Sequence, residues 1–484
     1  MFDGSAATGR ASPHSFSLVG PDSGRCRDDI GAVTVGESVI DQGPARRGPP
    51  RSTSLRKDPN MPVSLLRIVA CLIVAFTMSS AASGEDQWTR FRGADGSGRS
   101  ESTGTPATWS DNENIVWRTP LPGPGASSPV LYDGRLYLTC YTGYGDGNAA
   151  GTQQDLERHL LCVDPSNGTI IWDTPLASDH EVANYDGFIP LHGYASGTPA
   201  VDETGVYVFY GSTGAAAFDF DGSLRWKTHL GAGTHAFGTA NSPVIAGDLV
   251  IVNASVESGA LVALRKSDGS EAWRQEGIDR SWNTPILYRA LDGNQELALS
   301  VQGKVLTFDP ATGNPLWQAN AIDDYICPSI IVQDGILYAV GGRKNTTVAI
   351  RSGGRGDVTE THVLWSQGRG SNVSSPVFHE GHLYWASESR GIVYCADAKT
   401  GEVIYQERLE PKPDRIYASP LLAAGMIYYV SRDAGTFVVE AKPSFRLIAV
   451  NTIASDTSIF NGSPIVVGDR LILRSDKFLY AVGK

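Results

Sequence analysis

The side chains best able to bind or transform a ligand are histidines, acids, arginines and aromatic residues that stand in polar stretches between apolar runs. The candidates for binding a ligand or partner are His180, Tyr185, His192, His235, Trp282, Asp323, Asp324, Tyr325, Arg343, Arg369, Arg415, Tyr417 and Arg432. Metal binding by histidines and acids, anion binding by arginines and hydrolysis by an activated serine are the chemistries open to such a chain.

The histidines could bind a metal ion. His180, His192 and His235 could hold zinc if the fold brought them together with an acid. The helical spacing that would sharpen this reading is missing, and no GxSxG sequence supports a serine hydrolase. We therefore predict no metal site, and the sequence identifies no catalytic residue.

The arginines could bind an anion. Arg369 and Arg415 belong to a group in the C-terminal third that could hold a carboxylate or sulfate by paired hydrogen bonds. The alternative is a solvated rim of scattered charges. A protein or an anionic small molecule or glycan is therefore the expected partner. The net charge of −12, with no basic stripe to offset it, argues against nucleic acid.

The stretch FDPATGNPLWQ (308–318) also looks like a possible site, because it combines an acid, a proline, a Thr-Gly pair and a tryptophan. A calcium loop needs several spaced acids, and a phosphate loop needs GxxxxGK; neither is present. We predict a hairpin turn in which Asp309 accepts amide hydrogen bonds and Gly313 takes a positive φ, followed by a packed Trp317.

This stretch is one copy of a repeat. Related sequences are VDPSNGTIIW (163–172), LRKSDGSEAW (264–273) and ADAKTGEVIY (396–405). Between them a Ser/Thr-Pro pair and an apolar run recur, with landmarks at Pro129, Pro199, Pro243, Pro285, Ile330, Pro376, Pro420 and Pro464. After a first interval of 70 residues, the spacing stays between 42 and 46. Eight units of four short apolar runs predict an all-β, eight-bladed β-propeller of four-stranded antiparallel blades.

Each unit supplies strands a to d, and strand d carries a wedge residue. The structural residues of this pattern are Trp117, Trp172, Trp226, Trp273, Trp317, Trp365, Asp309 and Gly313. The last unit ends after strand c, while 113–121 matches a strand d. We expect this N-terminal strand to close the last blade, so that no sheet edge stays exposed.

The repeat also separates two faces. The a–b and c–d turns share one face and are expected to be tight and structural, whereas the b–c and d–a loops share the other and carry the irregular insertions. The predicted binding loops are 141–158, 177–195, 231–240, 318–327, 366–373 and 410–417. Long loops on a rigid scaffold commonly carry function.

The N-terminal region differs from the repeats. Residues 1–60 are expected to be disordered or to lie upstream of the true start at Met61. Residues 61–83 have the charge, apolar run and small residues of a signal peptide. An extended segment at 84–112 then leads into the propeller at 113–484. The predicted product is secreted to the periplasm or cell exterior, without a transmembrane anchor after cleavage.

Four cysteines remain after such cleavage: Cys140, Cys162, Cys327 and Cys395. They show no metal-ligand spacing. Cys140 and Cys162 fall on adjacent strands but out of register, so free buried thiols are expected.

The repeat "SPV-x-x-x-G-x-LY" followed by "ADA-x-TG-x-x-x-W/Y" resembles the PQQ-type propeller repeat of quinoprotein alcohol dehydrogenases and of the outer-membrane β-barrel assembly propeller lipoprotein. The leader WTRFRGADGSG (88–98) is similar to that of secreted planctomycete-type propellers. The dehydrogenase resemblance implies PQQ and calcium beside a disulfide of adjacent cysteines, and this sequence has no adjacent cysteines.

These observations lead to a secreted propeller that binds a ligand or protein, or acts as a scaffold in the bacterial envelope. No cofactor is predicted for it. The alternative is a PQQ- and calcium-dependent dehydrogenase of alcohols or sugars with a divergent site.

Overall fold

The computed structural model describes residues 87–147 and 150–484. The predicted upstream segment 1–60 and the predicted signal peptide 61–83 lie outside these residues. In the part that is described, no helix is long and apolar enough to cross a membrane.

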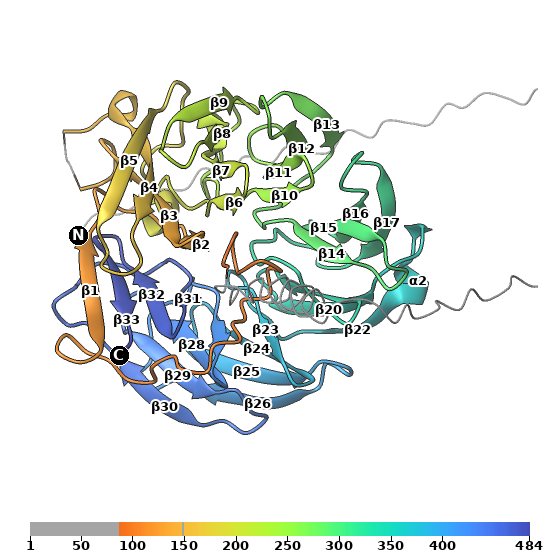
Figure 1. Cartoon of the computed structure of the whole chain (residues 1–484). Helices are drawn as coiled ribbons and strands as arrows, with labels where there is room; N and C mark the ends of the chain where they lie inside the picture. Colours follow the sequence, from red (N-terminus) through yellow and green to blue (C-terminus); the bar gives the residue numbers. More distant parts are fainter. Residues whose placement is uncertain (1–86, 148–149) are drawn as a thin grey trace, which may run out of the picture. The chain divides into compact units, whose positions relative to one another are not determined.

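The described residues form eight antiparallel sheets arranged as the blades of a propeller, seven with four strands and one with a fifth strand added (Figure 1). Blades 1 to 4 consist of β2 (Val130–Tyr132), β3 (Arg135–Thr142), β4 (Glu157–Val163) and β5 (Ile170–Ala177); β6 (Ala200–Asp202), β7 (Gly205–Phe209), β8 (Ala215–Phe218) and β9 (Leu224–Thr228); β10 (Val244–Ala246), β11 (Leu249–Ala254), β12 (Ala260–Arg265) and β13 (Glu271–Glu276); and β14 (Ile286–Arg289), β15 (Gln295–Val301), β16 (Lys304–Phe308) and β17 (Pro315–Asn320).

Blades 5 to 8 consist of β18 (Ile331–Gln333), β19 (Ile336–Gly341), β20 (Thr346–Arg351) and β22 (Val363–Gln367); β23 (Val377–His379), β24 (His382–Ala386), β25 (Ile392–Asp397) and β26 (Val403–Arg408); β27 (Leu421–Ala423), β28 (Met426–Val430), β29 (Thr436–Glu440) and β30 (Leu447–Asn451); and β31 (Ile465–Val467), β32 (Arg470–Arg474), β33 (Phe478–Val482) and β1 (Ile115–Pro120). Short helical turns are η1 (Gln153–Asp155), η2 (Ile189–Leu191), η3 (Gly211–Thr213) and α2 (Thr359–His362). The predicted eight-bladed propeller is confirmed.

In blades 1 to 7 the strands run from axis to rim in chain order, whereas in blade 8 β1 is the outermost strand, and the burial of each strand follows from its position. The middle strands β3 and β4 are buried along nearly their whole length, because each blade is stacked between two neighbours. The outer strand β5 alternates between half-buried and exposed positions, since only one of its faces packs on a neighbour. The continuous apolar runs therefore mark strands b and c.

The ring closes through the N-terminal strand, as predicted. β1 pairs antiparallel with β33, with Trp117 opposite Ala481 and Arg118 opposite Tyr480. The last blade therefore has its fourth strand, and β33 has no free edge.

A ring of hydroxyl groups links the blades near the axis. The residue before each landmark position is a serine or threonine: Ser128, Thr198, Ser242, Thr284, Ser329, Ser375, Ser419 and Ser463. In seven of the eight junctions, the amide of one such residue donates to the hydroxyl oxygen of the next, over 2.9–3.0 Å. Each link satisfies a buried backbone donor across a blade boundary.

The eighth junction, between blades 8 and 1, is built differently. No bond from Ser463 to Ser128 exists among the described residues, and the Ser128 hydroxyl is buried without a partner. The buried guanidinium of Arg474 donates to the Ser127 carbonyl over 2.9 Å instead. At this junction the hydrogen-bond donor is therefore a side chain, whereas at the other seven junctions it is a backbone amide.

The wedge tryptophans link the blades at the rim. The indole N–H of Trp117, Trp172, Trp226, Trp273 and Trp365 donates to a backbone carbonyl in the c–d turn of the following blade. The Asp309 turn receives Trp273: the Asp309 carboxylate accepts two amide hydrogen bonds, and Gly313 has φ +72°. A Cβ at Gly313 would lie 2.6 Å from the Trp273 ring, so this turn needs glycine.

Trp317 departs from this pattern. Its indole N–H donates to the buried carboxylate of Glu296 over 2.9 Å. The c–d connection of blade 5 is not a tight turn but an insertion with β21 (Gly356–Asp357) and α2, and β21 pairs parallel with β17. The expectation that every insertion lies on the loop face is therefore wrong for blade 5, whose insertion lies at its c–d connection.

The extended N-terminal segment fills the centre of the ring, as the orange trace in Figure 1 shows. Within 88–100, Trp88 pairs with Leu131 of β2, and the amide of Val201 in β6 donates to the segment. At its far end the segment exchanges two hydrogen bonds with Leu422 of β27. These contacts tie the segment to the inner strands of three blades.

Arg92 anchors this segment. The residue is 2% exposed, and its guanidinium donates to the carbonyls of Gly96 and Pro376 over 3.1 and 2.5 Å. Burial lowers the pKa of Arg92 to about 9, and the nearby carboxylate of Asp95 offsets only part of this effect.

All four cysteines in the described part are free, and Cys140 stands opposite His159 rather than Cys162. Register therefore keeps the two sulfurs apart.

Candidate functional site

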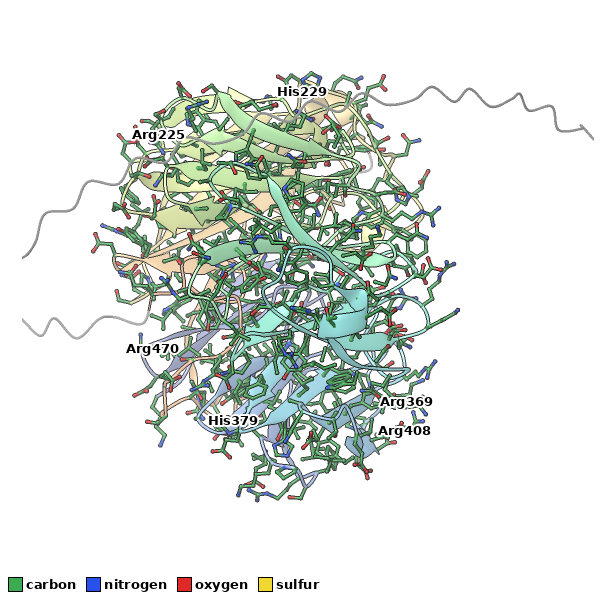
Figure 2. The ribbon with its side chains drawn as sticks, turned by 90° about the vertical axis from the view of Figure 1, so that its right-hand side faces the viewer. Arg225, His229, Arg369, His379, Arg408 and Arg470 are labelled. Carbon is green, nitrogen blue, oxygen red and sulfur yellow. The ribbon has the colours of Figure 1, made fainter. Side chains whose placement is uncertain are left out.

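The loop face carries a cavity of about 370 Å³ on the propeller axis. Residues from the d–a connections of all eight blades line it, together with Phe91 of segment 88–100. Figure 2 separates the two faces in side view: Arg369 and Arg408 stand on the loop face, and Arg225 and Arg470 on the turn face. Every blade therefore contributes to this cavity.

Aromatic rings form one wall of the cavity. Phe237 packs against Phe188, Trp282 and Tyr325, with ring centroids 4.8, 5.3 and 5.2 Å apart. The Trp282 indole N–H donates to the Gly238 carbonyl over 2.8 Å, which fixes its ring. Phe188 is 50% exposed, so this wall continues onto the surface.

Polar groups face the aromatic wall. Arg415 donates to the Tyr417 hydroxyl over 2.9 Å, and Glu388 enters from the b–c loop of blade 6. Asn372 and Asn461 use their amide N–H groups, donating to the Tyr325 hydroxyl and the Leu191 carbonyl. Their amide oxygens are buried without a hydrogen-bond partner.

His192 lies in the cavity wall as a structural, neutral imidazole. Its Nε2 is 2.8 Å from the Phe237 carbonyl, which can only accept, so Nε2 carries the proton. Its Nδ1 is 2.6 Å from the Ser196 hydroxyl and accepts from it. Burial lowers the pKa of His192, which keeps the ring neutral.

The other two histidines lie elsewhere. His235 packs edge-on against Trp282 and lines a separate cavity with Arg280 and Arg343. His180 stacks on His229 with centroids 3.7 Å apart. The three candidate zinc ligands therefore have three different environments. In the described ranges, no group of three or more His, Cys, Asp and Glu residues could hold a metal ion.

The candidate arginines also lie in different environments. Arg343 forms two hydrogen bonds of 3.0 Å with Asp324, and this pairing lowers the pKa of that carboxyl to about 2. Arg369 is exposed and donates to the Gly368 carbonyl, outside the cavity. Arg432 is buried behind Tyr417, with its guanidinium carbon 5.0 Å from the ring centroid.

Of the candidate arginines, Arg415 alone lines the axial cavity. Tyr185 packs with Tyr144 and Tyr194 in the loops of blade 1, and Asp323 is exposed. The axial cavity thus unites His192, Trp282, Tyr325, Arg415 and Tyr417 from the predicted set.

Sequence reasoning missed several cavity residues: Phe91, Phe188, Phe237, Asn372, Glu388, Asn461 and the ring hydroxyls. The hydroxyls had a visible signal, because a serine or threonine precedes all eight landmark positions. The others lie in irregular loops, where no period predicts orientation.

The eight-bladed propeller, together with a family model that matches most of its length, makes the chain a PQQ-like repeat protein. The family described as outer membrane protein assembly factor BamB matches residues 156–407 and 356–482, and the chain belongs to this family. It is 24% identical to outer membrane protein assembly factor BamB of Yersinia pestis over 341 residues, 65% of this chain and 77% of the relative.

Solved structures share the fold. BamB from Moraxella catarrhalis aligns with a TM-score of 0.54 at 17% identity, covering 76% of this chain and 97% of that one. A europium-containing methanol dehydrogenase aligns with a TM-score of 0.58 at 11% identity, covering 83% and 98%.

Proposed function

We propose that the chain is a binding and scaffolding module of the bacterial envelope and that protein partners dock on its loop face. Membership in the BamB family supports this role, since that name describes an assembly factor of outer membrane proteins. The segment at 61–83 would deliver the chain to the periplasm or the cell exterior.

The observation that carries the proposal is the aromatic surface at the mouth of the cavity. Phe188 is half exposed and packs edge-on against Phe237, so apolar area faces solvent where the d–a loops meet. Aromatic side chains at the centre of a polar rim are typical of protein interfaces.

A matched pair of variants tests this role. Phe188→Asp places a charge on the loop face, and Leu291→Asp does so at the a–b turn of blade 4, where Leu291 is 62% exposed. Tagged chains would be isolated from the native host, and the bound envelope proteins quantified. We expect a partner that is retained by the wild type and Leu291→Asp but lost from Phe188→Asp. Equal retention by both variants would contradict the proposal.

The alternative of a PQQ- and calcium-dependent dehydrogenase is not supported by the cavity residues. Glu388 is the one carboxylate and Cys327 the one thiol among the described residues that line it. Calcium takes about six to eight oxygen ligands, and a quinone tricarboxylate needs more positive charge than Arg415 alone provides. The cavity residues therefore do not fit a PQQ and calcium site.

A further inference from the structure

We propose that the axial cavity binds the end of a neutral saccharide. This rests on the proposed function in that both use the loop face, but it requires no protein partner. The unsatisfied hydrogen-bonding groups, the balance of charge and the aromatic wall together carry it.

The cavity is shaped for a small ligand that enters from one side. Phe91 and the hydroxyl ring lie on its inner side, and segment 88–100 occupies the axis beyond them. Its volume of about 370 Å³ is at the lower end of the ~300–1,000 Å³ typical of small-molecule sites. A long chain could not pass through it, whereas a terminal unit fits.

The hydroxyl ring supplies donors. The ring members that line the cavity are Thr284, Ser329, Ser375, Ser419 and Ser463. Each of these oxygens accepts an amide hydrogen bond from the preceding blade. Within the described part of the chain, none of the five hydroxyls donates to a protein group. Since a hydroxyl carries one donor, each has an O–H left for a ligand.

Two asparagines that line the cavity supply acceptors. The amide oxygens of Asn372 and Asn461 have no partner, and Asn461 is only 8% exposed. A buried acceptor without a partner costs free energy until a donor reaches it. Glu388 adds a carboxylate that accepts a long hydrogen bond of 3.4 Å from the backbone N–H of Asn372.

The charges in the cavity balance. Arg415 is positive, Glu388 is negative, and no ion pair joins them within the described residues. His192 is neutral because burial lowers its pKa, and both of its ring nitrogens already have partners within the protein. A strongly charged ligand would meet a like charge at one of the two side chains.

Together these groups select the chemistry of the ligand. An apolar ligand would leave the two amide oxygens unsatisfied, and a simple anion would face acceptors as well as Arg415. A sugar presents hydroxyl groups that both donate and accept, and its C–H faces pack on rings such as Trp282 and Phe237. A neutral polyol therefore matches donors, acceptors and the apolar wall at once.

Isothermal titration calorimetry of the full-length chain tests the site. The probes are glucose, galactose, mannose and N-acetylglucosamine, with the anions glucuronate and galacturonate and the zwitterion phenylalanine as ionised comparisons. We expect at least one neutral sugar to bind saturably, and more tightly than every ionised probe. Failure of all neutral sugars to saturate, or tighter binding of a uronate or of phenylalanine, would overturn the proposal.

Two arginine variants locate the binding. Arg415→Ala should weaken the sugar about tenfold or more, because it removes a charged donor from the cavity. Arg408→Ala, on the same face but outside the cavity, should leave the affinity unchanged. Equal losses in both variants would contradict an axial site.

Asn372→Ala is a second cavity variant, and melting temperatures of all variants check that each is folded. A failed sugar titration would leave the Phe188→Asp partner assay unaffected, so the two proposals fail separately.

Discussion

The hydroxyl ring makes a quantitative prediction, because the same residue type occupies a bonded and an unbonded position. Ser242 is 2% exposed, and its hydroxyl accepts from the Thr198 amide over 3.0 Å. Ser128 is 1% exposed, and its hydroxyl has no partner. Ser→Ala removes the same atom from the same motif position in both cases.

The expected free energies of unfolding differ clearly. Ser242→Ala leaves the Thr198 amide buried without an acceptor, which costs about 1–3 kcal/mol. Ser128→Ala removes a buried hydroxyl that bonds to nothing, so its cost should be near zero or the variant slightly more stable. The difference between the two variants isolates the inter-blade bond.

Urea denaturation monitored by tryptophan fluorescence is a suitable assay. The denaturation midpoints are compared between variants whose dependence of unfolding free energy on urea concentration is the same. A lower midpoint for Ser242→Ala with an unchanged Ser128→Ala would agree with the ring. Equal losses in both variants would refute the reasoning, since they would show that the hydroxyl bonds do not hold the blades together.

Two further predictions concern a turn and a buried acid. Gly313→Ala should destabilise the fold by about 1–2 kcal/mol more than Gly303→Ala, because both have positive φ but only a Cβ at 313 meets the Trp273 ring; equal denaturation midpoints would contradict this. Burial raises the pKa of Glu257 to about 7, so the folded state binds its proton more tightly than the unfolded state, and stability falls as pH rises from about 4.5 to 7. This loss, up to about 3 kcal/mol, should be missing in Glu257→Gln when denaturation midpoints of both proteins are compared from pH 4.5 to 7.5; parallel pH profiles would contradict it.

The fold was predictable because the same geometry acts on the sequence eight times. The landmark proline, turn glycine and wedge tryptophan recur in most of the blades, so a single misread unit could not hide the period. Trp317 is an exception. It occupies the expected position in the repeat, but its indole N–H donates to Glu296, because the c–d connection of the next blade, blade 5, carries an insertion instead of a tight turn.

The candidate site was predictable only to the level of the face. Arg369 and Arg415 both lie in d–a loops, yet only Arg415 reaches the cavity. Arg343 looked free in the sequence but pairs with Asp324, nineteen residues away. Loop conformation and long-range contacts decide such cases, and no local pattern reports them.

The N-terminal segment shows the same limit. Its sequence led us to expect an extended chain, but nothing in it indicated that Arg92 would be buried against Pro376 in the centre of the ring. A contact over 284 residues depends on the closed propeller, which exists only after all eight blades have formed.

The measurement that tests the central claim most directly is site-specific photo-crosslinking in cells of the native host. A photoreactive residue at position 188 probes the loop face, and one at position 291 probes the turn face. We predict that position 188 crosslinks to a defined envelope protein and that position 291 does not. Crosslinks to the same protein from position 291, with none from position 188, would show that the turn face is the functional one.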